Sequence, residues 1–116
     1  MLNQLMIPLA ILGMTGCAAV QIPPERLEHS EASIRGAQEA GALEVPAAKL
    51  HLQLARDQTD LAKKMAGNGD ERAALVLARA DSDAQLALVL AHSAAVHAEA
   101  VRATEELTAV RARGTR

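Results

Sequence analysis

The 116-residue sequence predicts an all-α fold, a three-helix antiparallel bundle or hairpin with a long C-terminal helix. Alanine fills about a fifth of the chain and Phe, Tyr and Trp are absent, a composition that favours helix because aromatic and β-branched residues favour strands. Pro and Gly stand at intervals that divide the chain after its apolar start into three stretches. With so few bulky side chains, we expect slender helices packed closely through small residues.

The N-terminal region, ahead of the predicted helices, is an apolar stretch that ends near the only cysteine of the sequence. Leu5 to Gly13 is an apolar stretch of about nine residues, well short of the roughly 20 that a membrane-spanning helix needs. Thr15-Gly16-Cys17 then resembles a lipobox, in which small residues precede the cysteine that receives a diacylglycerol. We therefore expect a signal peptide at 1–16 and a lipidated tether at 17–23 that begins with Cys17.

Two details depart from the usual signal, and two alternatives to lipidation stay open. Met1 to Gln4 carries no Lys or Arg, and Met14 stands where Leu is commonest. A plain secretory signal would more often end in Ala-x-Ala, and a buried structural Cys17 would need a core around it. With lipidation the membrane is a partner, and Ala18 favours the outer membrane, facing the periplasm, because Asp at that position is associated with inner-membrane retention.

The helical domain is predicted at 24–113, and its first two helices are bounded by Pro and Gly. The first is expected over Pro24 to Ala40, because Pro suits the first helical position and Gly41 suits a C-terminal cap. The second is expected over Pro46 to Ala66, ahead of Gly67-Asn68-Gly69, the strongest chain break in the sequence. Both connections are short enough to reverse the chain.

Apolar spacing predicts which helix faces are buried. In the second helix, three-, four- and seven-residue intervals mark one face, formed by Leu50, Leu54, Leu61 and Met65. In the third, alanines recur close to every 3.5 residues, as in a coiled-coil seam, at Ala73, Ala80, Ala84, Ala87, Ala91, Ala94 and Ala98. The run from Leu86 to Ala91 is apolar all round, which predicts either a middle helix sandwiched by the other two or a dimer face or partner groove.

The third helix is expected to run from Asp70, as N-cap or first-turn acid, to Arg113. At 1.5 Å per residue this is roughly 65 Å, about twice the length of the second helix. The outer half, about His92 to Arg111, therefore outruns its neighbours. We expect that half to bind a protein partner or a second copy through four apolar side chains at roughly helical spacing, Val96, Val101, Leu107 and Val110.

No group of residues suits catalysis, a cofactor or a metal. The histidines are His29, His51, His92 and His97. The last two stand five residues apart, about 140° around a helix, so they are no chelating pair. Asp81 and Asp83 lie on different faces of a helix, and we expect both to be solvated. The 12 basic and 14 acidic residues alternate without a basic stripe, which argues against nucleic-acid binding.

Several segments behind the lipobox-like motif resemble a bacterial family. They are Ala32-Ser33-Ile34-Arg35-Gly36-Ala37, Gly41-Ala42-Leu43-Glu44-Val45-Pro46-Ala47-Ala48-Lys49-Leu50, Leu54-Ala55-Arg56, Lys63-Lys64-Met65-Ala66-Gly67 and Ala78-Arg79-Ala80-Asp81-Ser82-Asp83-Ala84-Gln85-Leu86-Ala87. In this order, over about Glu25 to Val101, they resemble the lipoproteins grouped as domain of unknown function 4398. Val45 departs from the Ala expected there. The resemblance implies a helical, envelope-anchored domain with no established activity.

Two functions fit these observations. The first is a lipid-anchored envelope protein whose helical domain acts by interaction or scaffolding on the periplasmic side, without catalysis. The alternative is a periplasmic carrier or binding module that holds a small apolar ligand or lipid between its helices. A useful ligand pocket has several hundred cubic ångströms, and closely packed alanine-rich helices leave little such volume, so the carrier ranks second.

Overall fold

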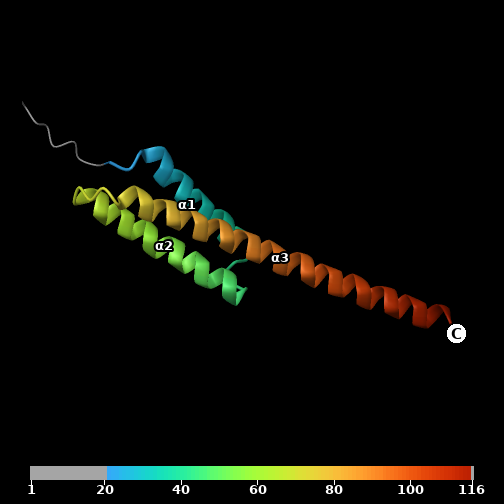
Figure 1. Ribbon diagram of the computed structural model, residues 1–116. Helices are drawn as coiled ribbons and strands as arrows, with labels where there is room; N and C mark the ends of the chain where they lie inside the picture. The colour runs from blue at the N-terminus through green and yellow to red at the C-terminus, as the bar shows by residue number, and fades with distance from the viewer. Residues whose placement is uncertain (1–20, 116) are drawn as a thin grey trace, which may run out of the picture.

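The computed structural model describes residues 21–115, and this part of the chain forms three helices joined by two short turns. They are α1 (Pro24–Glu39), α2 (Pro46–Gly67) and α3 (Ala73–Gly114). The chain reverses at each turn, so α2 runs antiparallel to α1 and α3, and the second half of α3 extends alone to the C-terminus (Figure 1). The predicted all-α fold with a long C-terminal helix is confirmed. Cys17 and the predicted signal peptide lie outside the described residues.

Both turns end the preceding helix with the same hydrogen-bond pattern around a glycine. After α1, the N–H of Gly41 donates to Gln38 and the N–H of Ala42 donates to Ala37, each over 3.0 Å. The φ of Gly41 is +87°, a left-handed conformation that L side chains rarely adopt. This is the Schellman motif, which satisfies carbonyl groups left free at the end of a helix. The predicted cap at Gly41 is confirmed.

The second turn repeats the motif with Gly69, whose φ is +74°. Its N–H donates to Ala66 over 3.0 Å, and the N–H of Asp70 donates to Met65 over 2.9 Å. Asp70 is therefore the last residue of this turn, and its prediction as N-cap or first-turn residue of α3 is wrong. The residue flanking α3 is Arg72, and the helix starts one position later.

Asp70 instead closes a small turn just ahead of α3. Its Oδ1 accepts hydrogen bonds from the backbone N–H of Arg72 at 2.9 Å and from Nε–H of the same residue at 3.0 Å. Its Oδ2 accepts a hydrogen bond from Nη2 of Arg72 at 2.7 Å. These hydrogen bonds to the side chain and backbone of Arg72 lower the pKa of Asp70 to about 2. The carboxylate thus orders the chain between α2 and α3.

The core between α2 and α3 is built almost entirely of small residues. Along α3 the buried positions alternate four and three residues apart, and we call them the inner seam: Ala73, Leu77, Ala80, Ala84, Ala87 and Ala91. On α2 the buried positions follow the same spacing at Ala48, Leu52, Ala55, Thr59 and Ala62. This 3.5-residue period is that of a coiled coil. The predicted alanine stripe is confirmed as far as Ala91; Ala94 is half-buried and Ala98 exposed.

The predicted leucine face of α2 is wrong. Leu50, Leu54 and Leu61 are 59%, 37% and 49% exposed. Each lies two positions after a buried residue, which is about 200° around the helix and therefore on its far side. Alanines on both helices let the backbones of α2 and α3 approach closely. At that distance a row of leucines does not fit between the two helices.

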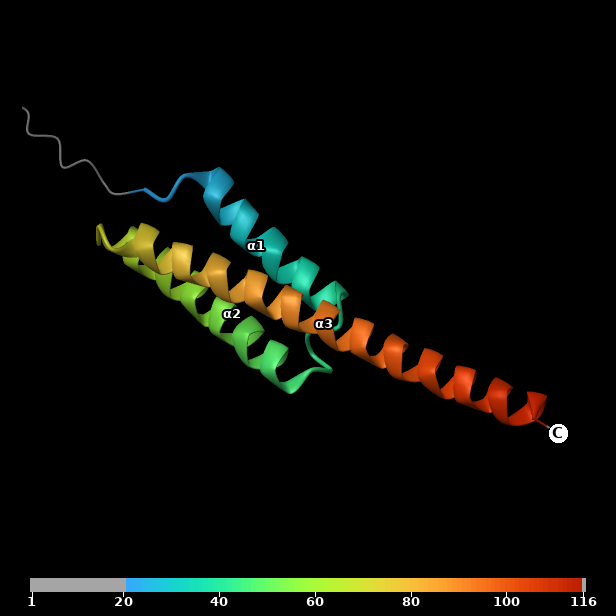
Figure 2. The ribbon, with the colours of Figure 1, turned by 45° about the vertical axis from the view of Figure 1, so that its right-hand side comes forward.

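α3 lies between the other two helices (Figure 2). It packs most extensively against α2, less against α1, and α1 and α2 touch each other least. Where α1 meets α2, the Thr59 hydroxyl donates to the Ala55 carbonyl at 2.8 Å, so the buried Ser30 hydroxyl, 3.2 Å from Thr59, donates to Thr59. The sandwich predicted for the run from Leu86 to Ala91 is found, yet it leaves one side open, because Leu86 and Val89 are exposed.

Candidate interaction surface

The second half of α3 extends beyond the other helices, as the lengths predicted. α2 has 22 residues and α3 has 42, so at 1.5 Å per residue α2 can cover only about half of α3. All described residues after Ala94 are exposed. We call residues 94–114 the projecting half and residues 73–91 the bundled half.

The structure brings three of the four predicted interaction residues onto one face. Val96, Val101, Leu107 and Val110 are 65%, 43%, 50% and 59% exposed. Val96, Leu107 and Val110 lie along one side of α3. Val101 follows Val96 by five residues, about 140° around the helix, and continues the line of the inner seam instead. The predicted row is therefore made of three residues.

That row is part of a longer one that sequence reasoning missed. Leu75, Leu86 and Val89, in the bundled half, are also exposed and share its phase. Positions alternating four and three residues apart form what we call the outer seam: Leu75, Arg79, Ser82, Leu86, Val89, Ser93, Val96, Ala100, Ala103, Leu107 and Val110. The outer seam is two residues out of phase with the inner seam, so it occupies the opposite face of α3. The signal available in the sequence was this second heptad period.

A groove between α2 and α3 borders the outer seam in the bundled half. It is lined by Gln58, Ala78, Arg79, Ser82, Asp83 and Leu86. Arg79, Ser82 and Leu86 belong to the outer seam, so one wall of this groove is the outer seam itself.

Asp83, in this groove, holds α2 and α3 together. Its Oδ1 lies 2.8 Å from Nδ1 of His51, and its Oδ2 accepts Nε2 of Gln58 at 2.7 Å. Asp81 is partly buried, and its Oδ1 has no hydrogen-bond partner among residues 21–115. The prediction that both carboxylates are solvated is therefore wrong. The pairing of Asp83 joins α3 to two side chains of α2.

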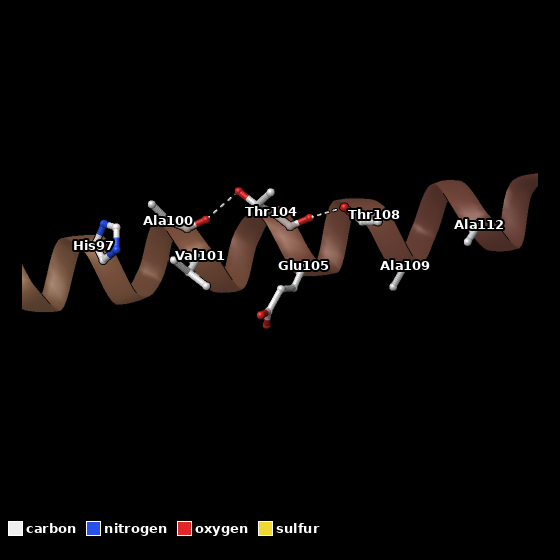
Figure 3. A pocket seen from close by; sticks show the side chains of 8 residues that line it. All are labelled: His97, Ala100, Val101, Thr104, Glu105, Thr108, Ala109 and Ala112. Carbon is white, nitrogen blue, oxygen red and sulfur yellow. Dashed lines mark hydrogen bonds between the residues drawn. The ribbon is translucent and has the colours of Figure 1, made fainter.

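Another face of the projecting half is hollowed but open. Its lining consists of His97, Ala100, Val101, Thr104, Glu105, Thr108, Ala109 and Ala112. All eight residues belong to one helix, so no second wall closes the space (Figure 3). The hydroxyls of Thr104 and Thr108 donate to the carbonyls of Ala100 and Thr104, each at 2.8 Å. Both hydroxyl groups therefore donate their hydrogen bonds within the helix, and the methyl groups remain on its surface.

The third hollow, between α1 and α2, is polar. It is lined by Glu31, Ile34, Arg35, Arg56, Thr59, Asp60 and Lys63. Lys63 donates to Glu31 at 2.7 Å across the two helices, and this hydrogen bond with the nearby positive charge lowers the pKa of Glu31. Charged walls of this kind do not suit a small apolar ligand.

Comparison with known proteins adds no relative, because no family model, curated protein or solved structure matches this chain. The resemblance to domain of unknown function 4398 therefore depends on the quoted sequence segments alone. Within residues 21–115, no helix is long and apolar enough to cross a membrane. The same residues contain no group of three His, Cys, Asp or Glu side chains that could hold a metal ion.

Proposed function

We propose that this protein is lipid-anchored at Cys17 in the bacterial outer membrane, faces the periplasm, and acts by binding another protein chain rather than by catalysis. The outer seam is the observation that carries the binding function. It exposes six Leu and Val side chains along one heptad row of α3, with Ala, Ser and one Arg between them. Exposed apolar rows of this kind mark sites of protein contact, and an amphipathic helix face is a common form of such a site.

The arrangement of the helices suits a scaffold that extends from its anchor. Gln21 to Pro23 lead into α1 at the end of the molecule where α2 turns into α3, and the projecting half points away from that end (Figure 1). A lipid at Cys17 would hold the end near this turn at the membrane. The projecting half would then reach outward to a partner.

The alternative of an apolar-ligand carrier has less support. A carrier needs a concave and mostly enclosed apolar site. Of the hollows described above, one lies on a single helix and two are lined partly by charged side chains. The bundle itself is filled by alanine side chains that leave the helices in close contact.

Replacing Cys17 tests the anchor. Cys17→Ser removes the thiol that accepts the diacylglycerol, and the protein should then stay unprocessed or be released from the membrane, since stable attachment needs more than one acyl chain. Membrane fractionation and the mass of the N-terminal peptide report both outcomes. Ala18→Asp is the matched control, expected to keep the lipid and change the membrane of residence. A Cys17→Ser protein that still fractionates as a mature membrane protein would refute the anchor.

Adding charges to the outer seam tests the binding surface. Val96→Glu combined with Leu107→Lys should abolish partner capture or self-association and leave helix content and thermal midpoint nearly unchanged, because both side chains are already exposed. The control places the same charges off the seam, with Ala95→Glu and Ala109→Lys, and should keep binding. If the seam variant unfolds instead, that half of α3 belongs to the core, and the binding surface must be sought on α1 near Arg35 and Glu39.

A further inference from the structure

We propose that the outer seam is the contact between two copies of this chain, whose α3 helices pair antiparallel along their whole length. The inference rests on the binding function proposed above and names the partner as a second copy. Its two-fold axis crosses α3 between Ala94 and Ala95. The projecting half of each copy then lies over the bundled half of the other.

The sizes of the side chains select the antiparallel direction and its register. With the axis between Ala94 and Ala95, four pairs of seam positions place one large residue opposite one small residue. Leu86 faces Ala103, Val89 faces Ala100, Ser82 faces Leu107, and Ser93 faces Val96 of the second copy. A seam packs best when large and small side chains alternate across it. All four of these pairs satisfy this rule in the same register.

A parallel pair would pack poorly along the same seam. In a parallel homodimer every seam residue faces its own copy. Leu107 would meet Leu107 beside layers of paired Ala100 and Ala103, so the gap between the helices would be uneven. Arg79 would also meet Arg79 within the seam, and like charges at short distance repel. In the antiparallel register, Arg79 faces Val110, and the two Arg79 side chains lie far apart.

Charges beside the seam fit the antiparallel register as well. His92 and Glu99 each precede a seam position on the same edge of α3. In the proposed register, His92 of one copy and Glu99 of the other lie across the edge from each other, about two residues, or ~3 Å, apart along the axis. Pairs at such flanking positions set the partner and the orientation of coiled coils. In a parallel pair, His92 would flank His97.

The length of α3 leads independently to the same register. Full antiparallel overlap of Ala73–Gly114 puts the axis at the midpoint of the helix, between Ser93 and Ala94. The side-chain pairing puts it about one residue away, ~1.5 Å along the axis. The overlap also covers the groove between α2 and α3, since Arg79, Ser82 and Leu86 line that groove. The projecting half of one copy would become a fourth helix on the bundle of the other.

Disulfide formation between engineered cysteines tests the pairing. In full-length protein purified in detergent, Leu86→Cys with Ala103→Cys should give a covalent dimer on oxidation, because the two positions face each other across the seam. Neither single variant should crosslink, since each position lies about 17 residues, or ~26 Å, from its own copy along the axis. A disulfide needs Cα atoms within about 7 Å, so we expect at least a tenfold excess of dimer in the double variant.

Controls separate this inference from the proposed function. The wild-type chain, oxidised alongside, reports any crosslink through Cys17, and Leu86→Cys with Leu107→Cys moves one thiol about 6 Å out of register and should crosslink far less. Exchanging sizes within one layer, Leu86→Ala with Ala103→Leu, should restore self-association that Leu86→Ala alone weakens.

Crosslinking of Leu86→Cys alone would show a parallel pair and overturn the proposal. The proposal would also be overturned if the wild type is monomeric and the double variant does not crosslink. In that case, Cys17 fractionation and capture of a different protein would still test the proposed function.

Discussion

The bundled and projecting halves of α3 belong to one uninterrupted helix, yet they differ in what surrounds them. The inner seam is fully covered in the bundled half, and its continuation through Ala98 and Val101 is exposed in the projecting half. The outer seam is exposed in both halves. A heptad row of small residues therefore marks where another helix can approach closely, and its period alone does not say whether one does.

The two halves also depend on different sources of stability. The bundled half is held by packing against α2 and by the contacts of Asp83. The projecting half must depend on its own helix propensity, whereas most helices in proteins are stabilised mainly by the packing of an apolar face. Arg111 and Arg113 lie in its last turn, where positive charge interacts favourably with the helix dipole. Pairing with a second copy would supply the packing that this half lacks.

Truncating one leucine in each half should give the largest contrast. Leu77 is fully buried and Leu107 is half exposed. Leu77→Ala leaves a cavity in the inner seam and should reduce the free energy of unfolding by about 2–5 kcal/mol. Leu107→Ala should change it by no more than about 0.5 kcal/mol at concentrations where the chain is monomeric. Urea unfolding followed by circular dichroism measures both, and equal losses would mean that the projecting half is packed.

Enlarging one alanine in each half should have a smaller effect of the same kind. Ala84 in the inner seam and Ala98 on its continuation occupy equivalent heptad positions two heptads apart. Ala84→Leu must force α2 and α3 apart and should cost about 1–3 kcal/mol of stability. Ala98→Leu meets no neighbour among the described residues and should be nearly neutral, since leucine is only slightly weaker than alanine as a helix former. Thermal midpoints of the two variants give the comparison, and a neutral Ala84→Leu would contradict the close approach of α2 and α3.

Acidification should weaken the bundle slightly. The pKa values of Glu31 and Asp70 are lowered by Lys63 and Arg72, so the unfolded chain binds protons that the folded chain does not. These groups therefore stabilise the fold above their ordinary pKa values, 4.5 for Glu31 and 3.8 for Asp70, and the Asp70 contribution is lost as the pH falls toward about 2. Both groups are partly exposed, so the effect is small. Urea midpoints from pH 5 to 2 should fall less in Asp70→Asn, and a midpoint that rises on acidification would contradict the argument.

Sequence reasoning located the helices because their ends are local features. Pro24, Pro46, Gly41 and Gly69 restrict or permit particular backbone conformations whatever lies around them. The buried face of α2 could not be found in this way. Its leucines and its alanines form two rows of the same period, and only the approach of α3 selects the alanine row. Asp83 was misjudged for the same reason, because its partners His51 and Gln58 come from another helix.

The outer seam could have been found from the sequence, since its period is strict from Leu75 to Val110. It was missed because the alanine stripe has the same period and already explained the apolar character of α3. The predicted row Val96, Leu107 and Val110 was its C-terminal part. Val101 has the phase of the inner seam, and the apolar residues of this half combine the two phases at mixed intervals. The partner of such a row depends on a second molecule, and the spacing within one chain does not contain that information.

The two glycine turns have a consequence for the rate of folding. Each reversal is closed by hydrogen bonds between residues three and five positions apart, and the helices that it joins are adjacent along the chain. Closing each short turn costs little entropy, because the two helices that it joins follow each other in the sequence, and only the packing of α1 against α3 joins helices that are not consecutive. Helical bundles of this kind fold in microseconds to milliseconds. We therefore expect α2 and the bundled half of α3 to form a hairpin within that time, before any encounter with a second copy.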